Sequence, residues 1–364
     1  MKITNVEPFV LRVPIRRPIG DATHNFDFWS ISGCWIRADN GLTGTGYTGL
    51  EGHGESLITD VIKDAYAPVV VGRDPNDVHA IWEELQWGKM HWVGRSGVTQ
   101  MALSAVDIAL WDLRSQAVEL PLWKLIGGHK ARIPSYNTDG GWLNWSLEEL
   151  VDDTERLIDD GWQGVKIKFG KPTLQEDLQR LAAVRERIGS GPMLMVDVNM
   201  AWTVPQARAA ARGLADSDVY WLEEPLYPDD VSGHAELARS INTPIALGES
   251  IYHRFQFRDF LVARAVGFLQ PDVTRVGGVT EWLRIAALGS SFNIPVVPHA
   301  GDMMQVHQHL VGASANAPMI EYIPWLLDAF ESPVRVDRGA VELPECSGAT
   351  TTLRADAIER WRVA

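Results

Sequence analysis

Cysteine is scarce in this chain of 364 residues, and long apolar runs are absent. The two cysteines, Cys34 and Cys346, form no metal-binding spacing and predict no disulfide framework. The N-terminal stretch MKITNVEPFVLRVP lacks the apolar centre of a signal peptide, and no segment approaches the length of a membrane span. We therefore expect a cytoplasmic protein that has no membrane partner.

Basic residues are outnumbered, since 33 Lys and Arg stand against 47 Asp and Glu and the formal net charge is −14. A protein this acidic is not expected to bind nucleic acid or an anionic membrane surface. An anionic small molecule remains possible, because a metal ion and nearby lysines can reverse the local field. Hydrophobic residues make up 46% and the mean hydropathy is −0.09, which is typical of a soluble globular protein.

The first part of the chain mixes strand and helix patterns. Two polar or glycine-rich stretches, residues 18–28 and 44–54, are interpreted as flexible loops. The second of them, GTGYTGLEGHG, is not a dinucleotide fingerprint, because no strand, turn and helix surround it in the required order. Residues 55–87 predict helices with a break at 72–75, and residues 98–117 form the clearest helical pattern.

After Pro121 and the glycine pair at 127–128, short apolar runs alternate with helical patterns. The strand candidates are 133–138, 165–169, 193–198, 219–223, 244–248, 267–271, 294–298 and 319–322. The helix candidates are 147–160, 174–188, 205–215, 232–240, 254–263, 279–291 and 304–315. This alternation predicts a (β/α) barrel. We expect one domain at 1–126 and the barrel at 127–323, with residues 324–364 folding back on the first domain.

Three candidate strands end on acids. Asp197 ends the apolar run in MLMVDVN, Glu223 the run in VYWLEEP and Glu249 the run in PIALGES, and successive acids stand 26 residues apart. Because parallel barrel strands end at one mouth, these carboxylates should converge there. They would repel one another unless a cation lay between them, and such oxygen ligands suit Mg²⁺. The plainer alternative is three unrelated surface acids.

Further polar side chains fall at the same predicted strand ends. They are Lys166, Lys168, Asn199, Asp272, His299 and Glu321. Lys166 and Lys168 are two residues apart in one strand and so point to the same face, and Asn199 faces the side of Asp197 for the same reason. A mouth that combines acids, two lysines and a histidine can remove a proton from a carbon beside a carboxylate.

These motifs give the chain a full-length resemblance to a known family. The motifs are ALSAVDIALWDLRSQAVELPLWKLIGG, GVKIKFG, MVDVN, WLEEP, GES, LQPDVTRVGG, VPHA and MIEY. Together they resemble the enolase superfamily and, within it, the mandelate racemase subgroup. The resemblance implies an α/β fold, in which an N-terminal α+β capping domain lies on a modified (β/α)₇β barrel. It also implies that Asp197, Glu223 and Glu249 bind Mg²⁺ as cofactor, with Asn199 assisting near the metal or the substrate.

The resemblance also implies catalytic roles. Lys168 would be the base on one face of the substrate, and Lys166 would lower its pKa and hold the substrate carboxylate. His299, oriented by Asp272, would be the acid or base on the other face. Glu321 would stay protonated and donate a hydrogen bond to the substrate carboxylate. The muconate-cycloisomerase-like subgroup would carry a lysine in place of Asp272, and this chain has none there.

Plainer roles for the same side chains stay open at this point. Lys166 and Lys168 could be solvated surface lysines, although a polar face in a predicted buried strand argues against it. His299 could be a hydrogen-bonded core histidine, and Asp272 could cap a helix.

Substrate specificity should come from the capping domain, whose loops close the mouth in this family. Residues 18–28 and 44–54 match those loops in order and composition. The candidate substrate contacts are therefore His24, Asn25, Tyr47, Glu51 and His53. Their polar chemistry favours a polyol acid over an aromatic acid such as mandelate, which would need an apolar cavity.

We therefore expect a Mg²⁺-dependent dehydratase of a sugar acid, either an aldonate or an aldarate. It would remove the C2 proton, pass through an enediolate and expel the 3-hydroxyl with help from His299, giving a 2-keto-3-deoxy acid. A racemase or epimerase of a 2-hydroxy acid and a sugar-acid lactone cycloisomerase stay open. A non-catalytic sugar-acid-binding protein is disfavoured by the intact Lys168 and His299. The expected partners are the small-molecule substrate and further copies of the chain in a homo-oligomer.

Overall fold

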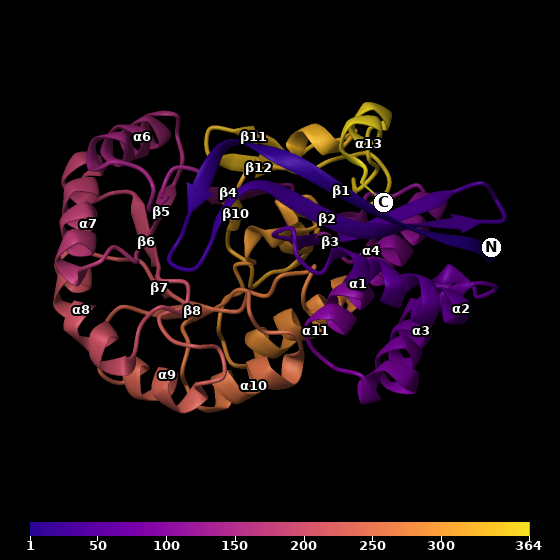
Figure 1. The fold of residues 1–364 in the computed structure, drawn as a ribbon, viewed down its shortest axis with the longest axis horizontal. Coiled ribbons are helices and arrows are strands. Elements are labelled where there is room, and N and C mark those ends of the chain that lie inside the picture. The colour runs from indigo at the N-terminus through magenta and orange to yellow at the C-terminus, as the bar shows by residue number, and fades with distance from the viewer. Residues whose placement is uncertain (364) are drawn as a thin grey trace.

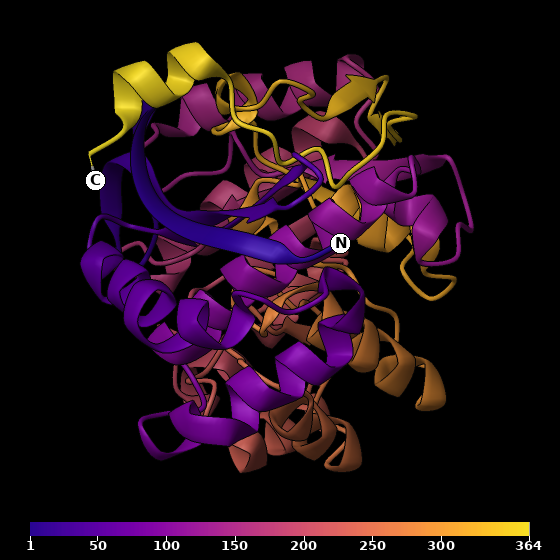
Figure 2. The same cartoon turned by 90° about the vertical axis from the view of Figure 1, so that its right-hand side faces the viewer.

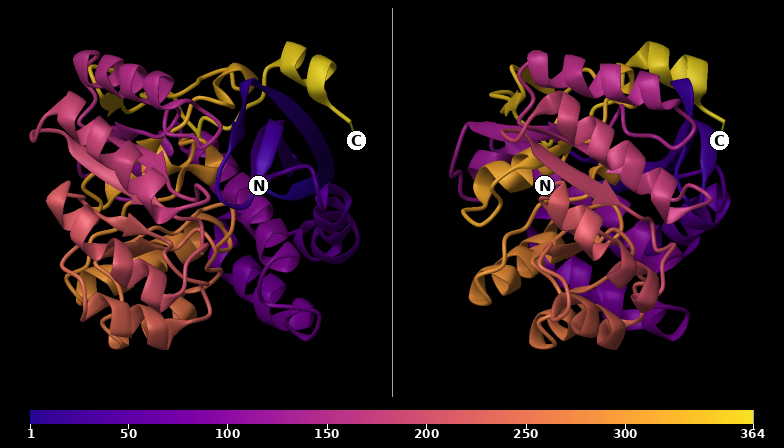
Figure 3. Two further views of the ribbon diagram at one scale, coloured as in Figure 1. Left: turned by 60° about the vertical axis from the view of Figure 1, so that its left-hand side comes forward. Right: turned by 90° about the vertical axis from the view of Figure 1, so that its left-hand side faces the viewer.

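The chain folds into a barrel ringed by helices, and a second body of sheet and helices lies against the barrel (Figure 1). The computed structural model describes residues 1–363. Figure 3 shows the two bodies from other directions, with the ring of helices on one side and the N-terminal sheet on the other. No helix among the described residues is long and apolar enough to cross a bilayer.

The N-terminal sheet has three antiparallel strands in the order β1 (Ile3–Gly20), β2 (Asn25–Ala38) and β3 (Thr43–Leu50). The pairing of β1 with β2 shifts register between Pro14 and Ile19. Beyond this irregularity the tip of the hairpin reaches across to the barrel (Figure 1). The backbone N–H of Leu143, in the loop after β4, donates to the carbonyl of Gly20 at 2.9 Å and holds the tip there.

The two stretches interpreted as flexible loops are largely strand, so that expectation is wrong. Only the turn at 21–24 interrupts residues 18–28, and residues 44–50 belong to β3. The glycines of β3 serve packing. A Cβ on Gly44 would lie 2.1 Å from the carbonyl oxygen of Ala109, and one on Gly46 would lie 2.0 Å from that of Ala105. Glycine therefore lets β3 lie directly on the following long helix.

That helix is α4 (Val98–Ala117), which matches the predicted bounds and is buried on most of its surface. It packs against β3 on one side and against α11 on another. The shorter elements of this body are α1 (Glu55–Asp60), η1 (Val61–Tyr66), α2 (Ala67–Val70), η2 (Pro75–Asp77), α3 (Val78–Glu84), η3 (Leu85–Lys89), η4 (Met90–Trp92) and α5 (Leu122–Leu125).

The barrel alternates strands and helices as the sequence predicts. Its strands are β4 (Arg132–Asn137), β5 (Gly164–Lys168), β6 (Met193–Asp197), β7 (Leu222–Glu223), β8 (Ile245–Leu247), β9 (Phe268–Leu269) and β10 (Ile320–Tyr322). Its helices are α6 (Leu147–Asp159), α7 (Leu174–Ile188), α8 (Val204–Asp216), α9 (Val231–Ala238), α10 (Arg254–Val262), α11 (Gly278–Ser291) and α12 (His307–Ala313), with the short η5 (Ala300–Asp302) before α12.

The strands β4 to β9 pair in parallel in chain order, and β10 pairs in parallel with β4 to close the ring. The strand expected at 294–298 is reduced to one bridge, between Leu269 and Val296. The fold is the modified (β/α)₇β barrel with an N-terminal capping body, as expected.

The C-terminal segment divides between the two bodies. Its hairpin of β11 (Arg335–Asp337) and β12 (Ala340–Glu342) extends the barrel, because β12 pairs antiparallel with the start of β4. After the short η6 (Leu327–Ala329) and this hairpin, α13 (Ala355–Trp361) lies beside β1 (Figure 2). The expected return to the N-terminal body therefore applies to the end of the segment and not to its hairpin.

Buried Asp112 on α4 ties the N-terminal sheet to the C-terminal segment. Its Oδ2 accepts hydrogen bonds from the backbone N–H of Thr45 at 2.9 Å and the side-chain amide of Gln116 at 2.8 Å. Its Oδ1 accepts from the backbone N–H of Ala349 at 2.7 Å. This one carboxylate thus accepts hydrogen bonds from the backbone N–H groups of Thr45 and Ala349, which are not used in strand pairing.

Replacing this side chain should destabilise the protein. Asp112→Ala should lower the free energy of unfolding by about 2–6 kcal/mol, because two buried N–H groups lose their acceptor at about 1–3 kcal/mol each. Asp60→Ala, at an exposed position of α1, is the matched control and should stay within about 0.5 kcal/mol of wild type in urea unfolding. Equal unfolding midpoints for the two variants would contradict the assignment.

Candidate active site

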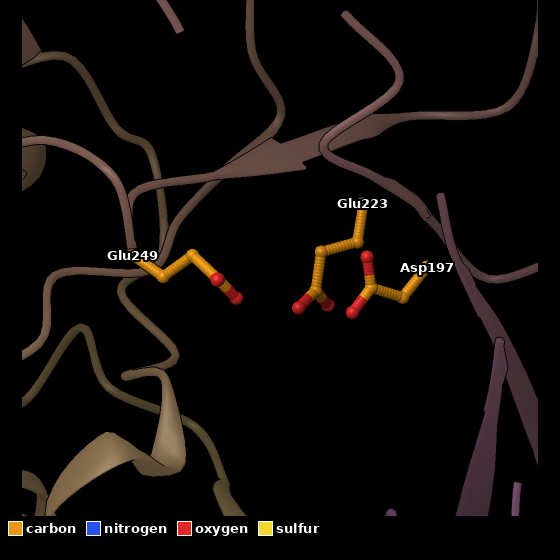
Figure 4. Close-up of side chains that lie close together, drawn as sticks. All are labelled: Asp197, Glu223 and Glu249. Atoms are coloured by element: carbon orange, nitrogen blue, oxygen red, sulfur yellow. The ribbon is translucent and has the colours of Figure 1, made fainter. Parts of the chain in front are cut away.

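Three carboxylates meet at the C-terminal mouth of the barrel. Asp197 ends β6, Glu223 ends β7 and Glu249 follows β8 by two residues. One carboxylate oxygen from each lies within 4.8 Å of the others. Figure 4 shows the three side chains pointing toward a common space. The structure thus brings together the three acids that the sequence places on successive strands.

Neighbouring donors fix the orientation of two of these acids. The Oδ1 of Asp197 accepts from the backbone N–H of Asn199 at 2.9 Å. The Oε2 of Glu223 accepts from the indole N–H of Trp221 at 3.0 Å and from the side-chain amide of Gln270 at 2.7 Å. Such outer partners hold metal-binding carboxylates in the geometry that a cation needs.

The donor set fits a hard divalent cation. Burial raises the pKa of Glu223 to about 7, and the negative charge of Asp197 adds to this effect, although Lys166 opposes it. A divalent cation among the acids would remove that electrostatic cost, and carboxylate oxygens suit Mg²⁺. The side-chain oxygen of Asn199 is buried and has no hydrogen-bond partner among the described residues. Asn199 lines the cavity at the barrel mouth, so this oxygen is available there as one more ligand.

The two lysines of β5 contact the acids directly. The Nζ of Lys166 lies 2.5 Å from Glu223 and 2.7 Å from Glu321, and the Nζ of Lys168 lies 2.5 Å from Asp197. Burial alone would lower the pKa of Lys168, but the charge of Asp197 raises it above the ordinary lysine value. A cation that binds Asp197 would compete for this contact and so free the amine.

His299 and Asp272 form a hydrogen-bonded pair. The Nδ1 of His299 lies 2.9 Å from Oδ2 of Asp272, and its Nε2 lies 3.1 Å from Oε2 of Glu249. Burial opposes ionisation of Asp272, but the hydrogen bond from His299 lowers its pKa below the ordinary range. The other oxygen of Asp272 accepts from the backbone N–H and hydroxyl of Thr274, at 2.8 and 2.7 Å. The pair is thus held from both ends.

The expectation of a protonated Glu321 is wrong in this structure. Burial opposes its ionisation, but Lys166 at 2.7 Å lowers the pKa of Glu321 to about 2. Its two oxygens also accept hydrogen bonds from the hydroxyl of Thr138 at 2.7 Å and from the backbone N–H of Ala300 at 3.1 Å. Every partner of Glu321 is a donor, so the carboxylate form is stabilised and acts as an acceptor.

The capping body contributes only part of the predicted contacts. His24 and Glu51 line the cavity above the acids. Tyr47 does not, because its side chain is fully buried and its hydroxyl donates to the carbonyl of Asp302 at 3.0 Å. Asn25 begins β2 with an exposed side chain, and His53 is also exposed. Neither of these two residues lines the cavity.

One cavity at the mouth of the barrel is lined by Lys166, Lys168, Asn199, Glu249, His299 and Glu321. Trp142 also lines the cavity. Several of its other residues were not singled out from the sequence: Asp21, Thr23, Phe26, Trp29, Thr138, Met200, Arg275, Met303, Ile323 and Trp325. Arg275 follows Asp272 by three residues in the motif LQPDVTRVGG. Its closeness to an acid at a strand end was the signal by which it could have been predicted to line the cavity.

A closed barrel with three acids on successive strands, two lysines on one side and a His–Asp pair on the other defines the class of protein. The chain belongs to the enolase superfamily and to its mandelate racemase subgroup. Residues 149–357 match the family described as enolase C-terminal domain-like. Residues 5–127 match the N-terminal domain of the mandelate racemase / muconate lactonizing enzyme family.

Characterised relatives share most of the chain. It is 34% identical to the 3,6-anhydro-α-L-galactonate cycloisomerase of Streptomyces coelicolor, over 99% of both chains. It is 36% identical to the L-talarate/galactarate dehydratase of Salmonella typhimurium, over 90% of this chain and 81% of the relative. A crystal structure of a Streptomyces coelicolor racemase with bound magnesium superposes with a TM-score of 0.94 at 32% identity, covering 99% of this chain and all of that one.

Removing one charge from the acid group should weaken magnesium binding. Glu223→Gln should raise the Kd for Mg²⁺ at least tenfold in calorimetric titration, because loss of a mere outer partner already costs about 10–100-fold. The exposed Glu236→Gln is the control and should bind Mg²⁺ as wild type does. Unchanged affinity in a folded Glu223→Gln protein would contradict the ligand assignment.

Gly301 should be required by the His–Asp pair. A Cβ at this position would lie 1.9 Å from Oδ2 of Asp272 and 3.0 Å from Nδ1 of His299. Gly301→Ala should therefore lower kcat on the order of tenfold or more while the Mg²⁺ affinity stays near that of wild type. The control is Gly191→Ala, where an added Cβ meets no atom within 4 Å. A Gly301→Ala enzyme with wild-type kcat would show that the pair tolerates displacement.

Proposed function

We propose that the protein is a Mg²⁺-dependent sugar-acid dehydratase that removes the C2 proton and expels the oxygen on C3. Its product would be a 2-keto-3-deoxy acid. Relatives that dehydrate sugar acids support this reaction class. The carboxylates, the Thr138 hydroxyl and the Asn199 amide that line the cavity support a hydroxylated acid as the substrate.

The observation that carries the proposal is the order of groups around the mouth. Lys168 contacts Asp197, the first acid of the series, and His299 contacts Glu249, the last. Two groups that can carry a proton, Lys168 and His299, therefore lie at opposite ends of the row of three acids. A substrate carboxylate held between them would present its C2 to one group and its C3 oxygen within reach of the other.

When bound, Mg²⁺ supplies Lewis-acid stabilisation for the enediolate charge. Lys166 adds a buried positive charge beside Glu223 and Glu321, where it can attract the substrate carboxylate. Lys168 takes the C2 proton, and the electrons of the C–H bond enter the enediolate. The C3–O bond then breaks, His299 donates a proton to the departing oxygen, and water leaves. The resulting enol takes up a proton at C3 to give the keto acid.

A cycloisomerase is the second candidate, favoured by the relative that matches 99% of this chain. The same residues can serve it. If the oxygen on C3 belongs to a ring, breaking the C3–O bond opens that ring and nothing departs. The product is then an isomer of the substrate, so its mass separates the two reactions. A dehydratase product is lighter by one water, and a cycloisomerase product is not.

Hydrogen exchange in D₂O should separate the roles of the two flanking groups. Lys168→Ala should lose both C2 exchange and elimination, whereas His299→Asn should keep exchange and lose elimination. Each loss should amount to about 10²–10⁴-fold in rate, as expected for an acid or base group. Exchange is followed by NMR and elimination by 2-keto acid formation, on a library of aldonic, aldaric and anhydro-sugar acids.

Lys63→Ala and His129→Asn are the matched controls, because both side chains are exposed and distant from the mouth in sequence. Exchange lost in His299→Asn but kept in Lys168→Ala would make His299 the base. Exchange in the wild type without any keto acid would indicate a racemase or epimerase. Near wild-type elimination in both variants would refute the proposed site as a whole.

A further inference from the structure

The wall of the cavity contributed by the capping body is acidic. His24, in the turn between β1 and β2, lies with Nε2 at 3.2 Å from Glu51 and Nδ1 at 3.4 Å from Asp21. Burial opposes ionisation of Asp21. The charge of Lys168 and the backbone N–H groups of Thr23 and His24, each 2.7 Å from Oδ1, nevertheless lower its pKa. Asp21 is therefore a fixed negative charge.

Glu51, whose carboxylate lies 3.2 Å from Nε2 of His24, is the second acid of this wall. Burial raises the pKa of Glu51, and the charges of Asp21 and Glu249 raise it further, although His24 and Arg275 act in the other direction. Another anion brought to this wall would meet the same repulsion. A hydroxyl group would instead find two carboxylates that can accept its hydrogen bond.

Among the described residues that line the cavity, each cationic side chain already faces a carboxylate. Lys166 and Lys168 contact the acid group at the barrel mouth. Arg275 lies between Glu249 and Asp272. Its Nη1 is 3.7 Å from the carboxylate of Glu249 and donates to the backbone carbonyl of Glu249 at 2.9 Å. Its Nε is 3.7 Å from the carboxylate of Asp272. His24 is shared by Asp21 and Glu51. A cation bound by the three acids would compete with Lys166 and Lys168 for these contacts, and both lysines lie at the reacting end, where the first carboxylate of the substrate is needed.

The remaining wall beside the hairpin is aromatic. Trp325 packs against Phe26, Trp29 and Trp142, with ring centroids 5.5–5.6 Å apart. Its indole N–H is directed to Asp139 at 3.0 Å. Such rings offer flat apolar faces to the C–H groups of a sugar and no positive charge to an anion.

We infer that the substrate carries a single carboxylate, so that it is an aldonate, open or ring-closed, and not an aldarate. The neutral, hydroxylated end lies against Asp21 and Glu51, while the aromatic wall covers its C–H face. The inference rests on the proposed function for the orientation of the carboxylate at the reacting end. It assigns to Asp21 and Glu51 the exclusion of a second carboxylate by like charge, with His24 lying between them.

The test compares aldonates with aldarates that share the configuration from C2 to C5. The pairs are D-galactonate with galactarate, D-gluconate with D-glucarate and D-mannonate with D-mannarate, together with their mirror images. The best aldonate should exceed its aldarate on the order of tenfold or more in kcat/KM. Binding of the same pairs to Mg²⁺-loaded His299→Asn, followed by the fluorescence of the cavity tryptophans, should show the same order.

Charge variants test the cause. The double variant Asp21→Asn and Glu51→Gln should reduce the ratio of aldonate to aldarate affinity, and Glu51→Lys should invert it. Asp27→Asn is the control, because this acid lies on the same hairpin with an exposed side chain and does not line the cavity. An effect of the control as large as that of the cavity variants would overturn the charge argument.

The failure of the inference differs from the failure of the proposed function. Aldarates that are eliminated or bound as well as their aldonates, in an enzyme that makes 2-keto acids, would overturn the inference and leave the function intact. If no compound yields a 2-keto acid, the proposed function fails, and the binding series still decides the inference. Preferential binding of aldonates supports it, and equal binding or no binding of any aldonate overturns it.

Discussion

Mutual repulsion among carboxylates governs the mouth of this barrel. Asp197, Glu223 and Glu249 are forced together by the parallel ends of β6, β7 and β8. Buried charges of one sign are stable only when cations accompany them. This need for accompanying positive charge explains why the two lysines of β5 and His299 lie beside the acids and why the site fits a divalent metal. The chemistry uses the same arrangement, because a site built to neutralise excess negative charge also stabilises the negative charge that develops on a carboxylate substrate.

The capping body also carries an acid whose ionisation depends on a lysine of the barrel mouth. Its hairpin places Asp21 near Lys168, where the lysine charge lowers the pKa of that acid. The long helix α4 and the buried carboxylate of Asp112 hold the sheet in place. The proposed function therefore divides reaction and selection between two bodies. In that proposal the barrel holds the groups that move protons, while the hairpin tip and the residue after β3, Glu51, face the remote end of the substrate.

The sequence predicts the barrel and its mouth well, because both follow from local patterns. Apolar runs that end on Asp197, Glu223 and Glu249 specify strand ends, and a parallel barrel has one place where such ends meet. The side-chain environments could not be predicted in this way. The ionisation of Glu321 depends on Lys166 at 2.7 Å, a distance that no spacing encodes. The glycine-rich strand β3 resembles a loop in sequence, because its glycines are selected by contact with Ala105 and Ala109 of α4. Tyr47 is buried away from the cavity, where its hydroxyl donates to the carbonyl of Asp302 and its ring packs on Phe330, contacts that no local pattern encodes.

The register shift between Pro14 and Ile19 has a consequence for how this architecture diversifies. In a regular hairpin, inserting or deleting one residue would turn every later side chain to the other face of the sheet. Here an irregularity already separates the tip from the regular pairing below it, so a change in tip length is absorbed locally. Descendants of this chain can therefore acquire tips of different length and composition while the buried face of the sheet, and the barrel beneath it, stay as they are.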